Sequence, residues 1–141
     1  MQRGRRMAFD FGDVRIGVAV SDPDGILASP VITLKASDRD LALQLQRLCD
    51  EYEPIAIYIG KPSNMDGSDG SAVDKAENFR QLMATITRTP ISFVDERMST
   101  VSASRSMRDS GISAKDARSR IDQAAAVAIL EFALSIEKNI K

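Results

Sequence analysis

The sequence MAFDFGDVRIGVAVS, residues 7–21, contains two apolar runs separated by a short turn. The runs predict two strands, at about residues 5–12 and 15–21, that are largely buried. One acid, Asp10, interrupts the first run. A carboxylate inside a buried strand is costly unless it is paired or bound to a cation, so this position is a candidate for function.

The remaining pattern is typical of one mixed α/β domain over residues 1–141, a five-stranded mixed sheet flanked by about four helices. Pro30 cannot donate to a strand ladder and favours an edge position for the third strand of an antiparallel meander. Ser37 is expected to cap the first helix, and the polar segment 109–118 is expected to be flexible. The other expected strands are 28–34, 55–60 (central and parallel) and 91–95, and the expected helices are 38–53, 72–87, 100–108 and 119–138.

Composition limits the chemistry that the chain can perform. It has no histidine, which excludes Ser-His and Cys-His nucleophile systems and histidine-ligated metals. Its single cysteine, Cys49, is expected to be a packing residue. A metal would be held by oxygen atoms, which favours Mg²⁺ or Mn²⁺. No apolar run is long enough to span a bilayer, so we expect a cytoplasmic protein without a membrane partner.

Three carboxylates occupy positions where the pattern predicts burial. Besides Asp10, Glu96 closes the fifth strand and Asp122 lies on the apolar face of the last helix. Each acid also has a purely structural alternative. Asp10 could begin a turn, Glu96 could pair with Arg97 or cap the next helix, and Asp122 could complement the dipole of its helix. Together they predict a site at the strand ends, where two divalent ions roughly 4 Å apart would clamp the oxygens of a phosphodiester.

Positive charge is concentrated in residues 97–120. Six Lys and Arg residues against two Asp residues leave this segment at +4, although the whole chain carries −1. The segment is a candidate phosphate-binding surface, with a solvated helix face as the alternative. The loop at 64–71 follows a buried strand and precedes a helix, which places backbone amides where an anion can bind. A flexible loop is the simpler interpretation, because no phosphate-binding or calcium-binding motif is complete there.

Four motifs in order resemble the YqgF family, whose members have an RNase H-like fold and are described as Holliday junction resolvases or pre-16S rRNA processing nucleases. The motifs are FDFGxxRIGVAVSD at 9–22, GxPxNMDG at 60–67, DERMST at 95–100 and IDxAAxxxIL at 121–130. The resemblance covers nearly the whole chain and implies that the catalytic, metal-binding carboxylates are Asp10, Glu96 and Asp122. Ala125 stands where RuvC-type resolvases usually carry a further acid, so three carboxylates are implied here.

The sequence therefore predicts a metal-dependent nuclease with Mg²⁺ or Mn²⁺, two ions bridged by Asp10, and water as the nucleophile. Substrate phosphates are expected to contact Arg15, Arg97, Asn64 and Lys115. The resemblance implies processing of the 5′ end of pre-16S rRNA in ribosome biogenesis. Alternatives are Holliday junction resolution in DNA recombination and repair, and a non-catalytic nucleic-acid-binding module. The chain contains no tryptophan for base stacking, which favours structured RNA or branched DNA as the substrate. The active species is expected to be a monomer or a homodimer.

Overall fold

A computed structural model describes the backbone of residues 2–61, 71–95 and 115–139, with the side chains of residues 2–61, 74–95 and 120–139. The described elements are, in chain order, β1 (Arg6–Phe11), β2 (Arg15–Ser21), β3 (Ala28–Lys35), α1 (Leu41–Tyr52), β4 (Ala56–Lys61), α2 (Ser71–Ile86), β5 (Ile91–Asp95) and α4 (Lys115–Asn139). Each of them corresponds to an element that the apolar pattern predicts. The helix expected at 100–108 lies outside the described residues.

The described strands form one mixed sheet in the order β3-β2-β1-β4-β5. β1, β2 and β3 pair antiparallel, which confirms the predicted meander. β4 pairs parallel to β1 and β5 pairs parallel to β4, so β4 is central, as its two apolar faces predicted. β3 is at an edge, as Pro30 predicted, and the register of β3 on β2 shifts beside the Ala19–Pro30 pair. The carboxyl ends of β1, β4 and β5 consequently meet at one edge of the sheet.

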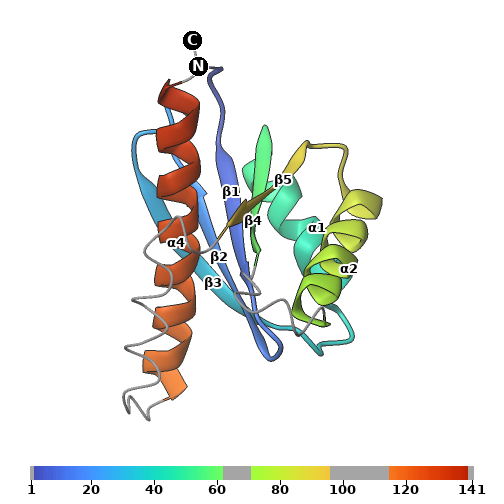
Figure 1. Cartoon of the computed structure of the whole chain (residues 1–141). Coiled ribbons are helices and arrows are strands. Elements are labelled where there is room, and N and C mark those ends of the chain that lie inside the picture. The colour runs from blue at the N-terminus through green and yellow to red at the C-terminus, as the bar shows by residue number, and fades with distance from the viewer. Residues whose placement is uncertain (1, 62–70, 96–114, 140–141) are drawn as a thin grey trace.

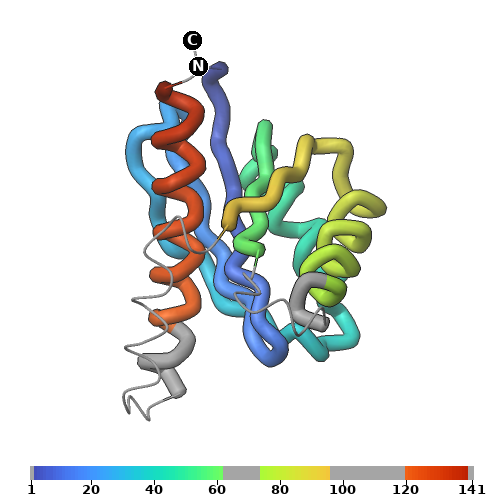
Figure 2. The backbone as a smooth tube through the Cα atoms, in the orientation of Figure 1, coloured from blue at the N-terminus to red at the C-terminus, as the bar shows by residue number. Residues whose placement is uncertain are grey.

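The two faces of the sheet are covered by different helices (Figures 1 and 2). α1 and α2 lie on one face, over a core of large side chains that includes Phe9 and Phe79. α4 crosses the other face, where the sheet presents Ala8 and Ala19 to the alanines of the helix. Because side chains alternate along a strand, Asp10 lies on the same face as Ala8, toward α4. Small residues on both sides allow α4 to approach the sheet closely.

The turn between β2 and β3 has the form that its sequence predicts. Gly25 has a φ of +67° and donates its backbone N–H to the carbonyl of Asp22. The Asp22 carboxylate accepts hydrogen bonds from the backbone N–H groups of Ile26 and Leu27. The bond from Leu27 is the main reason that the pKa of Asp22 is lowered. The turn thus fixes where β3 begins.

The start of α1 differs from the prediction. The helix begins at Leu41, its N-cap residue is Asp40, and no side chain caps it. The prediction that Ser37 caps this helix is wrong. The preceding backbone is already engaged, because Ala36 donates to Val14 and Asp38 donates to Lys35. These turn bonds hold residues 36–40 against the end of the meander, so the helix starts only after them.

The start of α4 also differs, and in the opposite direction. The helix begins at Lys115, four residues before the predicted position. The expectation of a flexible segment over 109–118 is therefore wrong for its last four residues. Lysine, alanine and arginine have high helix propensity, and a polar composition does not oppose helix formation where one face is exposed.

Two further observations bear on the expectations from composition. Cys49 packs, half-buried, against the core beneath α1, and burial followed by the charge of Asp50 raises the pKa of its thiol. A thiol held protonated is unreactive, which agrees with a packing role. Among the described helices, none combines the length and the apolar character needed to cross a membrane.

Candidate active site

Asp10 lies in the middle of the sheet, on the face that α4 covers. Its side chain is only 2% exposed. It pairs with Gly17 across the antiparallel β1–β2 ladder, and it follows directly after the pair that Phe9 forms with Ile59 of β4. The predicted acid inside a buried strand is therefore confirmed as buried, near the carboxyl end of β1.

Gly17 allows α4 to rest directly on β2. A Cβ atom at this position would lie 2.0 Å from the carbonyl oxygen of Asp122 and 2.5 Å from its carbonyl carbon. These are backbone atoms that no side-chain rotation can move, so only glycine fits. Gly17 thus touches the backbone of Asp122 across the layers and pairs with Asp10 across the strands, so both acids adjoin the same glycine.

Gly17 is not among the site residues that the sequence predicted. The available signal was a glycine in the interior of an apolar strand, which often marks a close approach of another backbone. Which backbone approaches depends on the path of α4, and that path is not visible in the strand itself.

Asp122 lies in the N-terminal half of α4, where it is buried and forms an ion pair with Arg15. Its side chain is 2% exposed, whereas that of Arg15 is 29% exposed. Nε of Arg15 donates to Oδ2 of Asp122 over 2.6 Å. A short, charge-assisted hydrogen bond of this kind offsets the cost of burying the carboxylate. Arg15, predicted to contact substrate, is thus bonded to one of the predicted catalytic acids.

The chemistry of the two buried acids suits a hard divalent cation. Asp10 and Asp122 offer carboxylate oxygens, the ligands that Mg²⁺ and Mn²⁺ prefer. The described side chains contain no group of three or more acids or cysteines placed to hold an ion. Glu96, the third predicted ligand, lies outside the described residues and directly follows Asp95, the last residue of β5.

The other predicted substrate contacts lie beyond the described side chains. Asn64 and Arg97 belong to segments outside the description, and Lys115 is described only as the first residue of α4. One further cation, Lys61, lies at the same sheet edge, as the last residue of β4. Lys61 is the register partner of Asp95 in the parallel β4–β5 ladder. Its Nζ is 5.5 Å from the centre of the Phe93 ring.

A groove of about 460 Å³ lies between α4 and the edge strand β3. Arg120 lines it together with Glu131 and the apolar residues Val127 and Pro30. Neither candidate acid lines this groove. Its mixed charge does not make it a strong phosphate-binding surface, so the buried acids remain the better candidate site.

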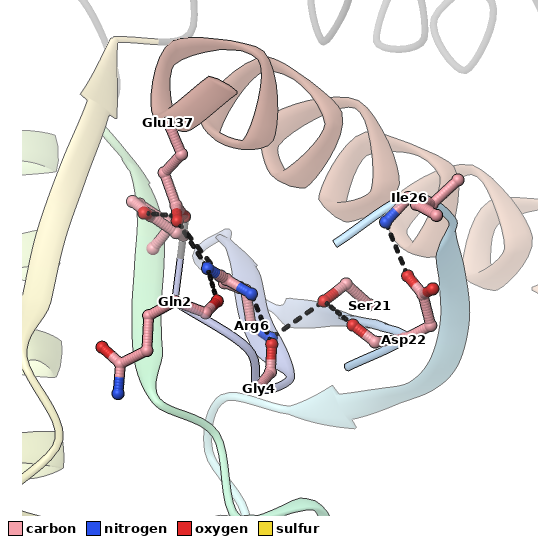
Figure 3. Close-up of polar contacts among 8 residues, drawn as sticks. Gln2, Gly4, Arg6, Ser21, Asp22, Ile26 and Glu137 are labelled. Carbon is pink, nitrogen blue, oxygen red and sulfur yellow. Dashed lines mark hydrogen bonds and ion pairs between the residues drawn. The ribbon is translucent and has the colours of Figure 1, made fainter. Parts of the chain in front are cut away.

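A second cluster of buried polar groups lies at the other end of α4 (Figure 3). Arg6 is 1% exposed and donates through Nε and Nη2 to Glu137. Its Nη1 donates to the carbonyl of Gly4 and its Nη2 to that of Gln2. The Tyr58 hydroxyl donates to the same Glu137 carboxylate. Every nitrogen of the guanidinium is used within the fold, which is the pattern of a structural ion pair.

Comparisons with known proteins agree with this fold and show its family. The model of the RuvX family, described as a Holliday junction resolvase, matches residues 4–136. A Streptomyces coelicolor protein named "Putative pre-16S rRNA nuclease" is 51% identical over 140 residues, 98% of this chain and 84% of the relative. A Mycolicibacterium smegmatis protein of the same name is 46% identical over 134 residues, 92% of this chain and 79% of the relative.

The fold itself matches a solved nuclease structure. The structure of Thermus thermophilus RuvC in complex with a Holliday junction substrate superposes with a TM-score of 0.64 over 96% of each chain, at 13% identity. This likeness identifies the fold as RNase H-like. With buried acids on β1 and α4, a family match over residues 4–136 and relatives that share about half of its residues, this chain belongs to the RuvX family of nucleases, also called YqgF.

Proposed function

We propose that this protein hydrolyses phosphodiester bonds with divalent metal ions held by Asp10, Glu96 and Asp122, and that its substrate is the 5′ end of pre-16S rRNA. The observation that supports the proposal is the junction at Gly17, which pairs with the buried Asp10 of β1 and contacts the backbone of the buried Asp122 of α4. The name of the Streptomyces and Mycolicibacterium relatives supports the choice of substrate.

The protein's own contribution is to fix the carboxylates in a dry environment. Mg²⁺ or Mn²⁺, when bound, would make a water molecule more acidic and stabilise charge on the reacting phosphate oxygens. Burial of Asp10 and Asp122 holds their oxygens in place and strengthens their attraction to cations. Because Gly17 has no side chain, α4 lies directly on β2 at this point, and Asp122 lies beside the residue that pairs with Asp10.

The proposed number of ions is two, with three carboxylates as ligands. Ala125, one helical turn beyond Asp122, is 1% exposed and packs in the same alanine-rich core as Ala8. It offers no ligand, so Glu96 is needed to complete the set. Two divalent ions carry more positive charge than three carboxylates neutralise, and the substrate phosphate would supply the remaining negative charge.

Substrate phosphates are proposed to contact Arg15, Arg97, Asn64 and Lys115. Arg15 is the member of this set whose side chain is described, and it lies beside Asp122 with part of its surface exposed. We further propose that residues 1–141 work as one RNase H-like domain in the cytoplasm, as a monomer or homodimer. One sheet that holds every described strand supports the single domain.

Holliday junction resolution is the second candidate function. The description of the matching family and the likeness to a RuvC structure favour it. A four-way junction is symmetric, so a resolvase acting on it is expected to work as a two-fold dimer. A nuclease that trims one RNA end has no such requirement, so the oligomeric state of the active species separates the two functions.

The test is cleavage of labelled pre-16S rRNA and of a four-way DNA junction with Mn²⁺ or Mg²⁺. We expect Asp10→Asn to lower the rate by roughly 10³-fold, because several kcal/mol of metal-ion stabilisation is lost and each factor of ten is about 1.4 kcal/mol. Asp13→Asn is the matched control, since Asp13 lies in the adjacent turn, is exposed, and pairs with Lys75.

Metal-dependent cleavage of one substrate, abolished by Asp10→Asn and retained by Asp13→Asn, would establish the function and name the substrate. Equal cleavage by the two variants would contradict the assignment of Asp10. If the folded wild type cleaves neither substrate but binds one of them, the protein is a nucleic-acid-binding module instead.

A further inference from the structure

We propose that Arg15 competes with the divalent metal for Asp122. In this view the guanidinium neutralises the buried carboxylate before metal binds and yields it when the metal arrives. The displaced guanidinium is then available to a substrate phosphate. The inference rests on the proposed metal-dependent function and adds an exchange of cations at one of its ligands.

The first support is the position of the ion pair. Arg15 is the first residue of β2, and its backbone carbonyl accepts a hydrogen bond from Gly12 across the β1–β2 turn. Its side chain reaches from this fixed point to Oδ2 of Asp122, over a sequence distance of 107 residues. The oxygen that it occupies belongs to a carboxylate proposed to hold metal. A cation from the protein therefore already lies where a divalent cation would be attracted.

The second support is the small cost of releasing Arg15. Its side chain is 29% exposed, and the contact made by its guanidinium, in the part of the chain that the structure describes, uses Nε. Turning toward solvent would rehydrate the guanidinium. Arg6 provides the contrast, because it is 1% exposed and each of its nitrogens has an acceptor inside the fold. Releasing Arg6 would leave a buried guanidinium without its partners, whereas the released guanidinium of Arg15 would enter water and its place at Asp122 would be taken by the metal.

The third support is the charge of the site. Asp10 and Asp122 both adjoin Gly17, so their negative charges repel one another in a region of low dielectric constant. One positive charge from Arg15 reduces this repulsion, and it equally reduces the attraction of the site for a divalent ion. Without Arg15, the carboxylates should bind metal more tightly.

The test is calorimetric titration of Mn²⁺ into the wild type, Arg15→Gln and Arg15→Lys. Removing one positive charge beside the ligands should lower the Kd for Mn²⁺ about tenfold in Arg15→Gln. Arg15→Lys keeps the charge but not the planar guanidinium and should lie between wild type and Arg15→Gln. Arg80→Gln is the matched control, because it breaks an Arg–Glu pair on α2, on the opposite face of the sheet, and should leave the Kd unchanged.

Thermal unfolding gives a second readout that does not depend on activity. Without metal, Arg15→Gln should melt below wild type, because Asp122 loses the charge-assisted hydrogen bond from Arg15. Saturating Mn²⁺ should raise its Tm by more than it raises that of wild type, since tighter binding to the folded state stabilises more.

An unchanged or weaker Kd in Arg15→Gln would overturn the competition. If Arg15→Gln does not fold without metal, the Arg15→Lys titration decides: tighter binding than wild type supports the proposal, and equal or weaker binding overturns it. Failure of the proposed function looks different. In that case folded wild type and Asp10→Asn bind Mn²⁺ alike or not at all, whereas failure of this inference alone leaves Mn²⁺ binding that depends on Asp10.

Discussion

α4 carries an ion pair with a buried member at each end, and the two pairs are built in opposite ways. At its C-terminal end the cation is inside: Arg6 is 1% exposed, and Glu137 is 21% exposed. At the other end the anion is inside: Asp122 is 2% exposed, and Arg15 is 29% exposed. A buried cation with every nitrogen bonded is fixed, whereas a buried anion with a partly exposed partner can exchange one cation for another.

The difference teaches how one helix serves both stability and chemistry. The Arg6–Glu137 cluster ties the C-terminal part of α4 to β1 (Figure 3). A hydrogen bond from Tyr58 to Glu137 ties it to β4 as well. The Arg15–Asp122 pair lies at the site proposed to bind metal. Substitutions at the C-terminal end are therefore expected to change stability alone, and substitutions near Asp122 are expected to change activity as well.

The largest stability effect is expected from Glu137→Ala. It leaves the guanidinium of Arg6 buried without its carboxylate, and breaking a buried pair in this way costs about 3 kcal/mol. The free energy of unfolding, measured in urea, checks this value. Cleavage per folded molecule should be unchanged. Glu131→Ala, an exposed acid two turns earlier on α4, is the control and should have little effect on unfolding. A loss of activity that exceeds the loss of folded protein would break the comparison between the two ends.

Gly17→Ala is expected to have the next largest effect on stability and to lower activity too. Its Cβ would meet the backbone of Asp122, and overpacking of this kind costs about 1–3 kcal/mol. The shift of α4 should also misplace the carboxylate, and a displacement near 1 Å costs about 10²-fold in rate.

Gly4→Ala is the matched control for Gly17→Ala. There the new Cβ would meet the side chain of Ile55, near the Arg6 cluster rather than near the acids. We expect lower stability with unchanged turnover, measured as Tm and as cleavage rate per folded molecule. Similar turnover in the two variants would show that the contact at Gly17 does not position the site.

The smallest effect is expected from Tyr58→Phe, and its size depends on pH. Burial, followed by the hydrogen bond to Glu137, raises the pKa of Tyr58 above its ordinary value of 10.0. Because the pKa is higher in the folded state, the neutral tyrosine stabilises the fold below pH 10.0, and this stabilisation is lost as pH rises beyond that value. The variant should lose about 1 kcal/mol at neutral pH through the missing hydrogen bond.

Above pH 10.0, wild type should therefore destabilise more steeply than Tyr58→Phe, and the two curves should converge. Urea unfolding between neutral and alkaline pH measures both slopes. Tyr52→Phe is the control, because that ring packs against the core beneath α1 rather than against α4. Parallel pH profiles for wild type and Tyr58→Phe would mean that the Glu137 cluster does not hold the tyrosine in its neutral form.

Much of the fold and part of the site follow from local pattern. Strand burial was predictable from apolar runs, and the edge position of β3 from Pro30, because both depend on each residue's own neighbours. Asp10 and Asp122 were recognisable as buried acids for the same reason. The burial of Arg6 was not, since it follows basic residues at the start of the chain and its carboxylate partner lies 131 residues away. The start of α1 was predicted too early, because backbone hydrogen bonds to Val14 and Lys35 hold the residues that precede the helix.

The sequence by itself determined the strands, the principal helices, the oxygen-only choice of metal ligands in a chain without histidine, and the family resemblance. Only the tertiary structure decided that α4 rests on Gly17 and that Arg15, rather than standing ready for substrate, is bonded to Asp122. The physical reason is distance along the chain. Apolar periodicity reports which residues leave water, but the partner of a buried charge is set by how a helix crosses a sheet, and that crossing joins residues more than a hundred positions apart.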